Sequence, residues 1–297
     1  MSCAPVLLVL FNREDTTSQV FEAIRRQRPA KLFISADGPR LNVPGEAEAC
    51  QRARAVVDHI DWPCEVHKRF LTENVGCARG VSEAISWFFD HVDEGIIFED
   101  DCLPDPSFFR FATEILEKYR NEPRIMHISG NNFLFGKKRG NASYYFSHWT
   151  HNWGWATWKR AWKYFDINLL PESERKHIWD AQWRMSVEKR GGLAIAPNVN
   201  LVSNIGCGRP DATHTYDTAP EYASLRTQEM IFPLSHPAKL RKMDRYTDYT
   251  LFRGTNSFHG LFVKPAIYCL WVAAAKTGKA LLPNKLRLWL KQNLLNG

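Results

Sequence analysis

The first 130 or so residues alternate short apolar runs with amphipathic stretches, and this alternation restricts the fold more than any other feature of the chain. Runs such as Pro5–Phe11 and Lys31–Ala36 have the length and continuous apolar character of strands that are buried on both faces. The intervening stretches carry apolar residues at helical spacing, as in Val81, Ile85 and Phe88. This order of elements predicts an α/β fold with a mostly parallel central sheet flanked by helices. We expect strands at 5–11, 31–36, 64–70, 95–98 and 125–129, and helices that begin near residues 15, 46, 76 and 106.

After residue 135 the pattern changes and tryptophan becomes frequent. Seven of the eleven tryptophans lie between residues 149 and 183. Tryptophans gathered in this way either fill the core under a loop-rich half or line a groove for a ring-shaped ligand, and the sequence leaves both interpretations open. We divide the chain into an α/β half (1–135), a tryptophan-rich half (136–237) and a basic C-terminal extension (238–297).

The net charge of +7 is distributed unevenly along the chain. Residues 238–297 carry a net charge of +9, and the other 237 residues carry −2. The stretch from Leu281 to Leu294 has leucines at helical spacing. It therefore forms either a basic amphipathic helix on an anionic membrane surface or a C-terminal helix packed on the core. No nucleic-acid-binding motif accompanies the charge, so we do not expect a nucleic acid as partner.

Hydrophobic residues make up 44% of the chain and charged residues 24%, which excludes a disordered or fibrous protein. The apolar stretch Ala266–Ala275 is too short to span a bilayer, and the N-terminus lacks the basic region of a signal peptide. Seven scattered cysteines without CxxC spacing argue against a zinc site or a disulfide framework. We expect a cytoplasmic protein, located at the inner face of the cytoplasmic membrane if the C-terminal extension binds lipid.

Three consecutive acids, Glu99-Asp100-Asp101, directly follow the apolar run that ends at Phe98. Acids at the end of a buried strand are costly unless something neutralises them. Ligands bind at the carboxyl ends of parallel strands, and hard divalent cations prefer carboxylate oxygens and leave positions open for phosphates. The triplet therefore predicts an Mn²⁺ or Mg²⁺ site that bridges a diphosphate. The alternative is an acidic turn exposed to water.

Polar residues also follow other predicted strands. Asn12 and Arg13 follow the first strand and Asp37 follows the second, so all three are expected at the same crevice. Arginine there can hold phosphate, and aspartate can accept a hydrogen bond from a base or a ribose hydroxyl. Asn74 and Arg79 flank a glycine at the start of a predicted helix, where backbone N–H groups favour anions.

The run NVGCARGVSEAISWFFDHVDEGIIFEDDCLPDPSFFRF, residues 74–111, resembles the nucleotide-sugar-binding half of GT-A glycosyltransferases. The group it resembles most includes N-acetylglucosaminyltransferase I and bacterial sugar transferases. The resemblance implies a GT-A, Rossmann-like fold in which 1–135 binds the nucleotide sugar and 136–237 binds the acceptor. It implies that Asp101 binds Mn²⁺, that Asp100 and Glu99 contact the donor ribose or sugar, that Arg13 contacts the nucleotide and that Asp37 contacts uracil.

The resemblance continues more loosely into the tryptophan-rich half. The stretch that starts at Trp153 and includes Trp155 resembles an acceptor-side helix of the same family. The segment Trp179–Trp183 resembles a helix whose aspartate is the catalytic base, which makes Asp180 the candidate base. Because the spacing departs from the family pattern, three other acids remain candidates: Glu172, Glu174 and Glu188. A solvated helix acid is the alternative for Asp180.

A histidine, His214, follows a predicted strand and a glycine-containing loop, and it is a candidate ligand of the metal or the diphosphate. An ordinary hydrogen-bonded histidine is the alternative, and His148 and His151 are weaker candidates of the same kind.

Together these features predict a metal-dependent, inverting glycosyltransferase that moves a sugar from a nucleotide sugar, expected to be a UDP-sugar, to a hydroxyl of a glycan or lipid-linked acceptor. Two alternatives remain. A sugar-phosphate nucleotidyltransferase would use a similar fold and a metal, but it usually carries a glycine-rich loop after the first strand, which this chain lacks. A non-catalytic carbohydrate-binding protein would explain the tryptophans but not the acidic triplet.

Overall fold

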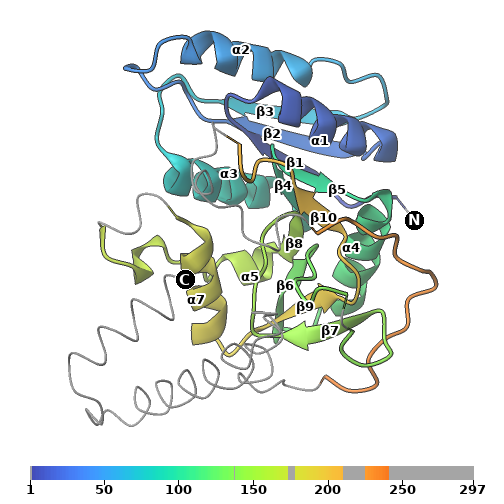
Figure 1. Ribbon diagram of the computed structural model, residues 1–297. Helices are drawn as coiled ribbons and strands as arrows, with labels where there is room; N and C mark the ends of the chain where they lie inside the picture. The colour runs from blue at the N-terminus through green and yellow to red at the C-terminus, as the bar shows by residue number, and fades with distance from the viewer. Residues whose placement is uncertain (1, 137, 173–177, 210–224, 241–297) are drawn as a thin grey trace.

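Eight strands of the described residues form one mixed sheet in the order β3-β2-β1-β4-β8-β6-β9-β7 (Figure 1). The structure is a computed structural model that describes residues 2–136, 138–172, 178–209 and 225–240. The predicted α/β class with a mostly parallel sheet flanked by helices is confirmed. The C-terminal extension beyond residue 240, with its predicted amphipathic helix, lies outside the described residues.

The first half of the sheet is parallel throughout. Strand β1 pairs in parallel with both β2 and β4, and β2 pairs in parallel with β3. Their carboxyl ends therefore meet at one edge of the sheet. The strands are β1 (Val6–Leu10), β2 (Lys31–Ala36), β3 (Glu65–Phe70) and β4 (Glu94–Glu99), and the helices that connect them are α1 (Glu14–Gln27), α2 (Glu46–Val56) and α3 (Cys77–His91).

The second half adds antiparallel pairs to the same sheet. Strand β8 (Trp155–Trp158) lies between β4 and β6 (Ile125–Ser129) and is antiparallel to both. Strand β9 (Leu193–Pro197) pairs in parallel with β6, and β7 (Tyr144–Ser147) closes the far edge of the sheet. The prediction of a helix from Trp153 onward is wrong at this point. The segment is a strand because all four residues of β8 are buried between helices on both faces of the sheet.

A second, two-stranded sheet is not predictable from the sequence, because its strands have only three residues each. It pairs β5 (Cys102–Pro104) with β10 (Val202–Asn204) in antiparallel register. Helix α4 (Pro106–Tyr119) follows β5, and the side chain of Asp105 caps it by accepting a hydrogen bond from the Ser107 N–H. The remaining helical elements are α5 (Lys159–Trp162), the 3₁₀ turn η1 (Ile167–Leu169) and α7 (Asp180–Lys189).

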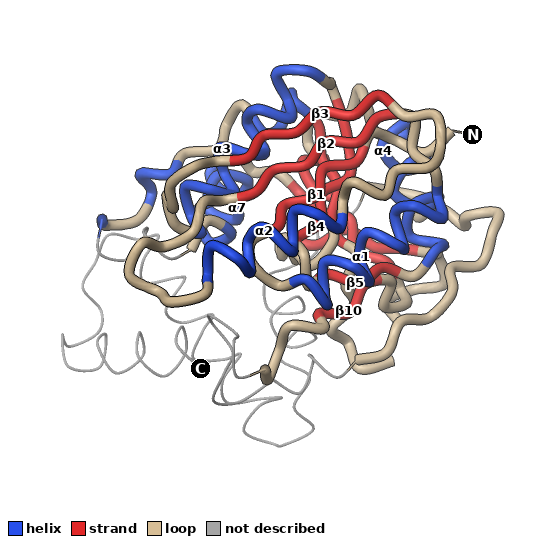
Figure 2. Tube along the Cα trace, turned by 90° about the horizontal axis from the view of Figure 1, so that it is seen from above, coloured by secondary structure: helices blue, strands red, loops and turns tan. Residues whose placement is uncertain are grey.

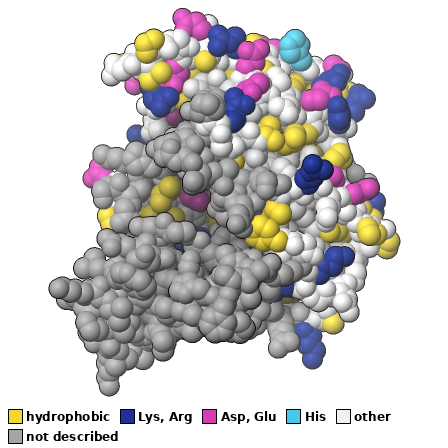
Figure 3. Space-filling view, viewed as in Figure 1, with side chains coloured by type: hydrophobic (Ala, Val, Ile, Leu, Met, Phe, Trp, Pro, Cys, Tyr) yellow, Lys and Arg dark blue, Asp and Glu magenta, His cyan; other side chains and the backbone are white. Residues whose placement is uncertain are grey.

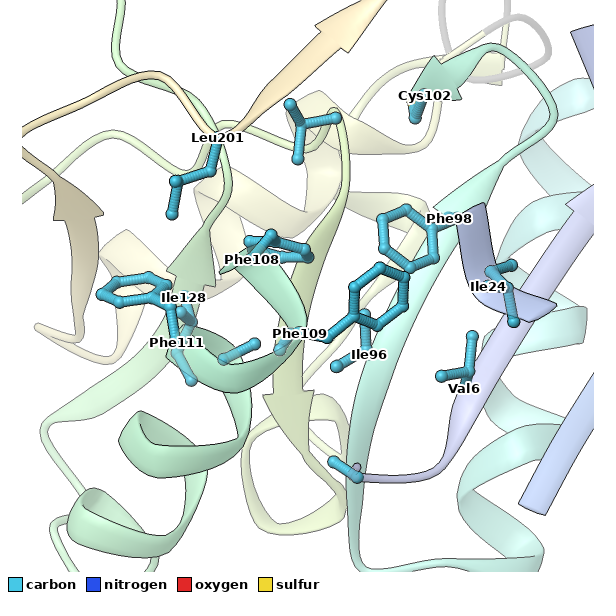
Figure 4. Packing of buried hydrophobic residues seen from close by; sticks show 14 of the residues in the cluster. Val6, Ile24, Ile96, Phe98, Cys102, Phe108, Phe109, Phe111, Ile128 and Leu201 are labelled. Carbon is cyan, nitrogen blue, oxygen red and sulfur yellow. The ribbon is translucent and has the colours of Figure 1, made fainter. Parts of the chain in front are cut away.

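The sheet separates two hydrophobic layers. Helices α1, α2 and α4 pack on one face, where Phe98, Phe108 and Phe109 interlock (Figure 4). Helices α3, α5 and α7 pack on the other face around Trp155. Figure 2 shows α1 and α2 side by side on one side of the strands. Each layer contains large fully buried rings, so the strand ends between the layers are held rigidly.

Charges of both signs are interspersed over the upper part of the face in Figure 3, which carries α1 and α2. This mixture agrees with the near balance of acids and bases outside the C-terminal extension. Among the described residues, the structure contains no helix long and apolar enough to cross a membrane.

Candidate functional site

A cavity of about 600 Å³ opens at the carboxyl ends of β1, β2 and β4. Its size is in the range of small-molecule sites, and its place is where α/β proteins bind ligands. It brings together nine of the residues that the sequence singled out: Asn12, Arg13, Asp37, Asn74, Glu99, Asp100, Asp101, Trp153 and Asp180.

The acidic triplet faces Arg13 across the cavity floor. The guanidinium Nη1 of Arg13 lies 3.0 Å from Oδ2 of Asp101 and 3.6 Å from Oδ1 of Asp100. The backbone N–H of Phe11 donates to Oδ2 of Asp100 at 3.0 Å. The end of β1 therefore supplies both a positive charge and a backbone donor to the acids that follow β4.

The three acids carry more negative charge than Arg13 can balance. Burial, and next the charge of Asp101, raise the pKa of Asp100 to about 7. Burial raises the pKa of Glu99 well above its ordinary value, and the carboxylates of Asp101, Asp100 and Asp180 raise it further. A ligand that brings additional positive charge to this site is therefore bound favourably.

Asp37 joins the end of β2 to the start of α3. Its carboxylate accepts three backbone hydrogen bonds, from Gly38 (2.8 Å), Val75 (2.9 Å) and Gly76 (3.1 Å). The close approach of these two loops requires a glycine at 38, because a Cβ there would lie 2.4 Å from the carbonyl carbon of Glu73. The carboxylate predicted to contact uracil thus first holds the loop that forms one wall of the cavity.

The loops around Asn12 are fixed by a buried acid. Glu46, at the start of α2, is 3% exposed and accepts hydrogen bonds from Asn12 Nδ2 (3.0 Å) and from the backbone N–H of Arg40 (2.7 Å). The Arg40 guanidinium beside it holds the pKa of Glu46 below its usual range, with burial opposing this shift. The Asn12 amide is therefore oriented by the protein, with its carbonyl oxygen left for other contacts.

The opposite wall comes from the tryptophan-rich half. Trp153 and Trp179 line the cavity, and Trp179 stacks on the buried Trp155 with ring centroids 5.6 Å apart. Asn131 accepts a hydrogen bond from the backbone N–H of Trp153 at 3.1 Å. The cluster is therefore divided between the core and the cavity lining, since Trp155 is buried while Trp153 and Trp179 line the cavity.

A buried histidine connects the two parts of this wall. Nε2 of His127 donates to the carbonyl of His151 at 2.8 Å, and Nδ1 accepts from Nε1 of Trp183 in α7 at 3.1 Å. Burial lowers the pKa of His127 to about 3, so the ring is neutral at ordinary pH and has one donor and one acceptor. His127 thereby ties α7, which carries Asp180, to the loop that carries Trp153.

Residues 204–206 pack against Asp101, the last acid of the triplet. The N–H of Ile205 donates to the carbonyl of Asp101 at 2.8 Å. A Cβ at Gly206 would lie 2.4 Å from Oδ2 of Asp101 and 2.9 Å from Nη1 of Arg13. Only a glycine allows the chain to pass this close to the ion pair.

The predicted metal fits this site only with help from a substrate. In the part of the chain that the structure describes, no group of three or more His, Cys, Asp or Glu side chains is arranged to hold a metal ion. One oxygen of Asp101 contacts Arg13, and the Cys102 thiol lies 3.4 Å from the other. Magnesium-like cations are commonly held by one or two carboxylates plus substrate phosphates. The donor set here matches that mode and does not match an all-protein cage.

Two predicted contacts are not at the cavity and are corrected here. Arg79 is not part of the cavity lining, and its guanidinium pairs with Glu83 one turn further along α3. Trp155 is 1% exposed within β8, so it supports Trp179 from below and has no open face for an acceptor.

Of the other acid and histidine candidates, those that the structure describes are not part of the cavity lining. Glu172 is exposed, and Glu188 lies 3.6 Å from Arg184 along α7. His148 and His151 do not line the cavity. Glu174 and His214 lie outside the described residues.

Several residues at the cavity were not singled out by the sequence. Cys77, Arg69 and Gly206 belong to this group. Cys77 begins α3 directly after Gly76, so the predicted helix start was a usable signal for it. Arg69 and Gly206 had no local signal, because their place depends on strand pairing and on the β5–β10 contact.

No protein-family model matches the chain, and no curated protein matches it. Among solved structures, a cytidylyltransferase from Leptospira borgpetersenii serovar Hardjo-bovis is 12% identical, with a TM-score of 0.37 over 64% of this chain and 74% of that one. A UDP-glucose pyrophosphorylase complexed with UDP-glucose is 11% identical, with a TM-score of 0.38 over 65% and 90%. HddC from Yersinia pseudotuberculosis complexed with GMP-PN is 11% identical, with a TM-score of 0.39 over 69% and 95%.

Proposed function

We propose that the protein is a glycosyltransferase that transfers a sugar from a nucleoside-diphosphate sugar to a hydroxyl of a glycan or lipid-linked acceptor. The proposed donor is a UDP-sugar. This proposal rests on two groups of residues in one cavity. Arg13 contacts the acids at 99–101 at the ends of the strands, and Trp153 and Asp180 line the opposite wall. The first group suits a diphosphate with its cation, and the second suits a sugar ring and a proton acceptor.

Each part of the donor has a matching part of the cavity. Arg13 contacts the diphosphate, while Asp101 accepts the divalent cation that neutralises the leaving phosphate when it is bound. Asp37 keeps the loop at residues 74–76 against the end of β2 and thereby shapes the nucleoside end. The sugar lies toward Glu99 and Asp180, whose carboxylates are close enough for Asp180 to affect the pKa of Glu99.

Asp180 is the proposed base of an inverting transfer. Its carboxylate takes the proton of the acceptor hydroxyl as the acceptor oxygen forms a bond to the anomeric carbon. The bond from that carbon to the diphosphate breaks, and its electron pair leaves with the nucleoside diphosphate. The tie through His127 and Trp183 keeps α7 in place during this step.

A sugar-phosphate nucleotidyltransferase is the second candidate, because the same carboxylates suit the cation of a nucleoside triphosphate. The connection between β1 and α1 argues against it. It consists of Phe11, Asn12 and Arg13 only, and it has no glycine-rich segment to surround a triphosphate.

The deciding experiment compares products. With Mn²⁺, a UDP-sugar and a glycan acceptor, the glycosyltransferase releases UDP. With UTP and a sugar 1-phosphate, the nucleotidyltransferase releases pyrophosphate. Asp101→Asn and Asp180→Asn should each abolish UDP release, whereas Glu188→Gln on the same helix α7 should leave it intact. Release of pyrophosphate alone would replace the first proposal by the second, and binding of glycan without nucleotide or metal would replace both.

A further inference from the structure

We propose that the cavity selects its nucleotide by an oxo group on the base, with Ser35 and Arg69 as the residues that distinguish uracil from cytosine. This inference rests on the proposed function and concerns the end of the cavity that lies farthest from the tryptophans. Its starting point is the order in which the strands bring their side chains to the cavity.

Four residues of the cavity lining form one row across the parallel strands. The register pairs Arg69 of β3 with Ser35 of β2. It also pairs Val9 of β1 with Ser35 on one side and with Glu99 of β4 on the other. Paired residues of parallel strands point to the same face of the sheet, and all four line the cavity. Because adjacent strands are about 4.8 Å apart, Ser35 and Arg69 lie roughly 10–14 Å from the strand that leads into the acidic triplet.

The order of the strands separates the two ends of a bound donor. Arg13 and Asp101 follow β1 and β4, in the middle of the cavity. Trp153 precedes β8, which lies on the far side of β4 from β1. Ser35 and Arg69 belong to β2 and β3, on the other side of β1. A diphosphate held at Arg13, with its sugar toward the tryptophan wall, therefore extends its nucleoside toward Ser35 and Arg69.

The hydroxyl of Ser35 is a buried donor that lacks an acceptor. Ser35 is 2% exposed, and its oxygen accepts a hydrogen bond from Nη1 of Arg69 at 3.4 Å. Within the described residues, that is its one side-chain hydrogen bond, so the O–H itself donates to no protein atom. A buried hydroxyl whose donor is unused costs free energy. A ligand atom that accepts from Ser35 is therefore bound favourably.

Arg69 adds further donors at the same place. Its Nη2 lies 2.9 Å from Oε2 of Glu83, and in the described part of the chain only Ser35 and Glu83 accept hydrogen bonds from its guanidinium. A guanidinium has five N–H groups, so most of them remain for a ligand or water. Glu83 also pairs with Arg79 on α3, so one carboxylate is shared by two guanidiniums. The position therefore favours a ligand group that accepts hydrogen bonds.

The free groups of Ser35 and Arg69 suit a carbonyl oxygen of a base better than an amino group. Uracil presents an oxo group at position 4, where cytosine presents an amino group that can only donate. A site that donates hydrogen bonds to a substrate atom rejects the analogue that cannot accept them, because its buried donors are then left unpaired. Asp37 accepts three backbone hydrogen bonds and holds the loop, so Ser35 and Arg69 are the residues that distinguish the bases.

The test compares UDP with CDP, which differ only at positions 3 and 4 of the base. Binding of each is measured calorimetrically with Mn²⁺ on the full-length chain. We expect CDP to bind more weakly than UDP by a factor of about ten or more. Ser35→Ala and Arg69→Met should each reduce this ratio several-fold, chiefly by weakening UDP. Lys68→Met is the matched control on β3. Its side chain points to the opposite face of the sheet and pairs with Asp58, so the ratio should stay unchanged.

The outcomes separate this inference from the proposed function. If UDP and CDP bind equally well, or if CDP binds more tightly, the base selection is wrong while the nucleotide site stands. The same conclusion follows if the ratio persists in both variants. If neither nucleotide binds, the proposed function fails, and the selection falls with it. Melting temperatures identify any loss of fold. Ser35→Ala adds no bulk and Arg69→Met leaves Glu83 paired with Arg79, so two independent substitutions decide the question.

Discussion

Replacing Asp37 tests whether the cavity wall is held by one side chain. In Asp37→Ala, the N–H groups of Gly38, Val75 and Gly76 all lose the carboxylate that accepts from them. Hydrogen bonds to a charged acceptor contribute about 1.5–3 kcal/mol each, and water can replace part of this where the donors are half-exposed. We therefore expect a loss of roughly 2–4 kcal/mol in the free energy of unfolding, and a fall of roughly 4–10 °C in Tm.

The assay is urea unfolding followed by fluorescence, together with hydrogen exchange of the three amides. The control is Asp58→Ala, which removes an exposed carboxylate paired with Lys68 and should change stability by less than about 0.5 kcal/mol. If Asp37→Ala unfolds like the wild type and its amides stay protected, Asp37 does not hold the wall. Loss of UDP binding in such a stable variant would then assign Asp37 to ligand contact alone.

Four further outcomes follow from the site. Arg13→Gln should weaken binding of UDP with Mn²⁺ at least tenfold by calorimetry, and unchanged affinity would remove Arg13 from the phosphate site. Gly206→Ala places a Cβ 2.4 Å from Oδ2 of Asp101 and should weaken the same binding, so wild-type affinity would show that the loop moves away without cost. His127→Phe leaves the Trp183 N–H without its acceptor and should cost about 1–3 kcal/mol in urea unfolding. Because the pKa of His127 is lowered from 6.5 to about 3, the unfolded chain binds the proton more readily, and wild-type stability should fall by about 1.4 kcal/mol per pH unit from this group as pH drops from 6.5 toward 3. This part of the slope should disappear in His127→Phe, and an unchanged slope would contradict it.

The parallel half of the fold was predictable because local patterns determine it. Each of its strands is a continuous apolar run or follows a clear helix, and its helices have one buried stripe, as in Val81, Ile85 and Phe88 of α3. The observed strands and helices begin within a few residues of the predicted positions. The residues that follow these strands, among them Arg13 and Asp37, were placed at one edge for the same reason.

The second half was less predictable because its strands depend on partners far away in the sequence. Strand β8 has four buried residues and no alternation, so its period does not distinguish a strand from a helix. For this reason Trp155 was predicted to contact the acceptor, whereas it is buried and stacks against Trp179. Strands β5 and β10 are too short to carry any period, and their pairing across about 100 residues is what brings Gly206 to Asp101.

The order of the sheet has a consequence for how the chain can be shortened or synthesised. Within the described residues, β6 pairs only with β8 and β9, and both are encoded after it. A fragment that stops shortly after β6 leaves that strand without neighbours and exposes the edge of β4. Exposed strand edges pair with other chains, so such a fragment is expected to aggregate. On the ribosome, the strand that ends at the acidic triplet acquires its second neighbour only after residue 158 has emerged, so the cavity at its carboxyl end forms late among the described parts of the fold.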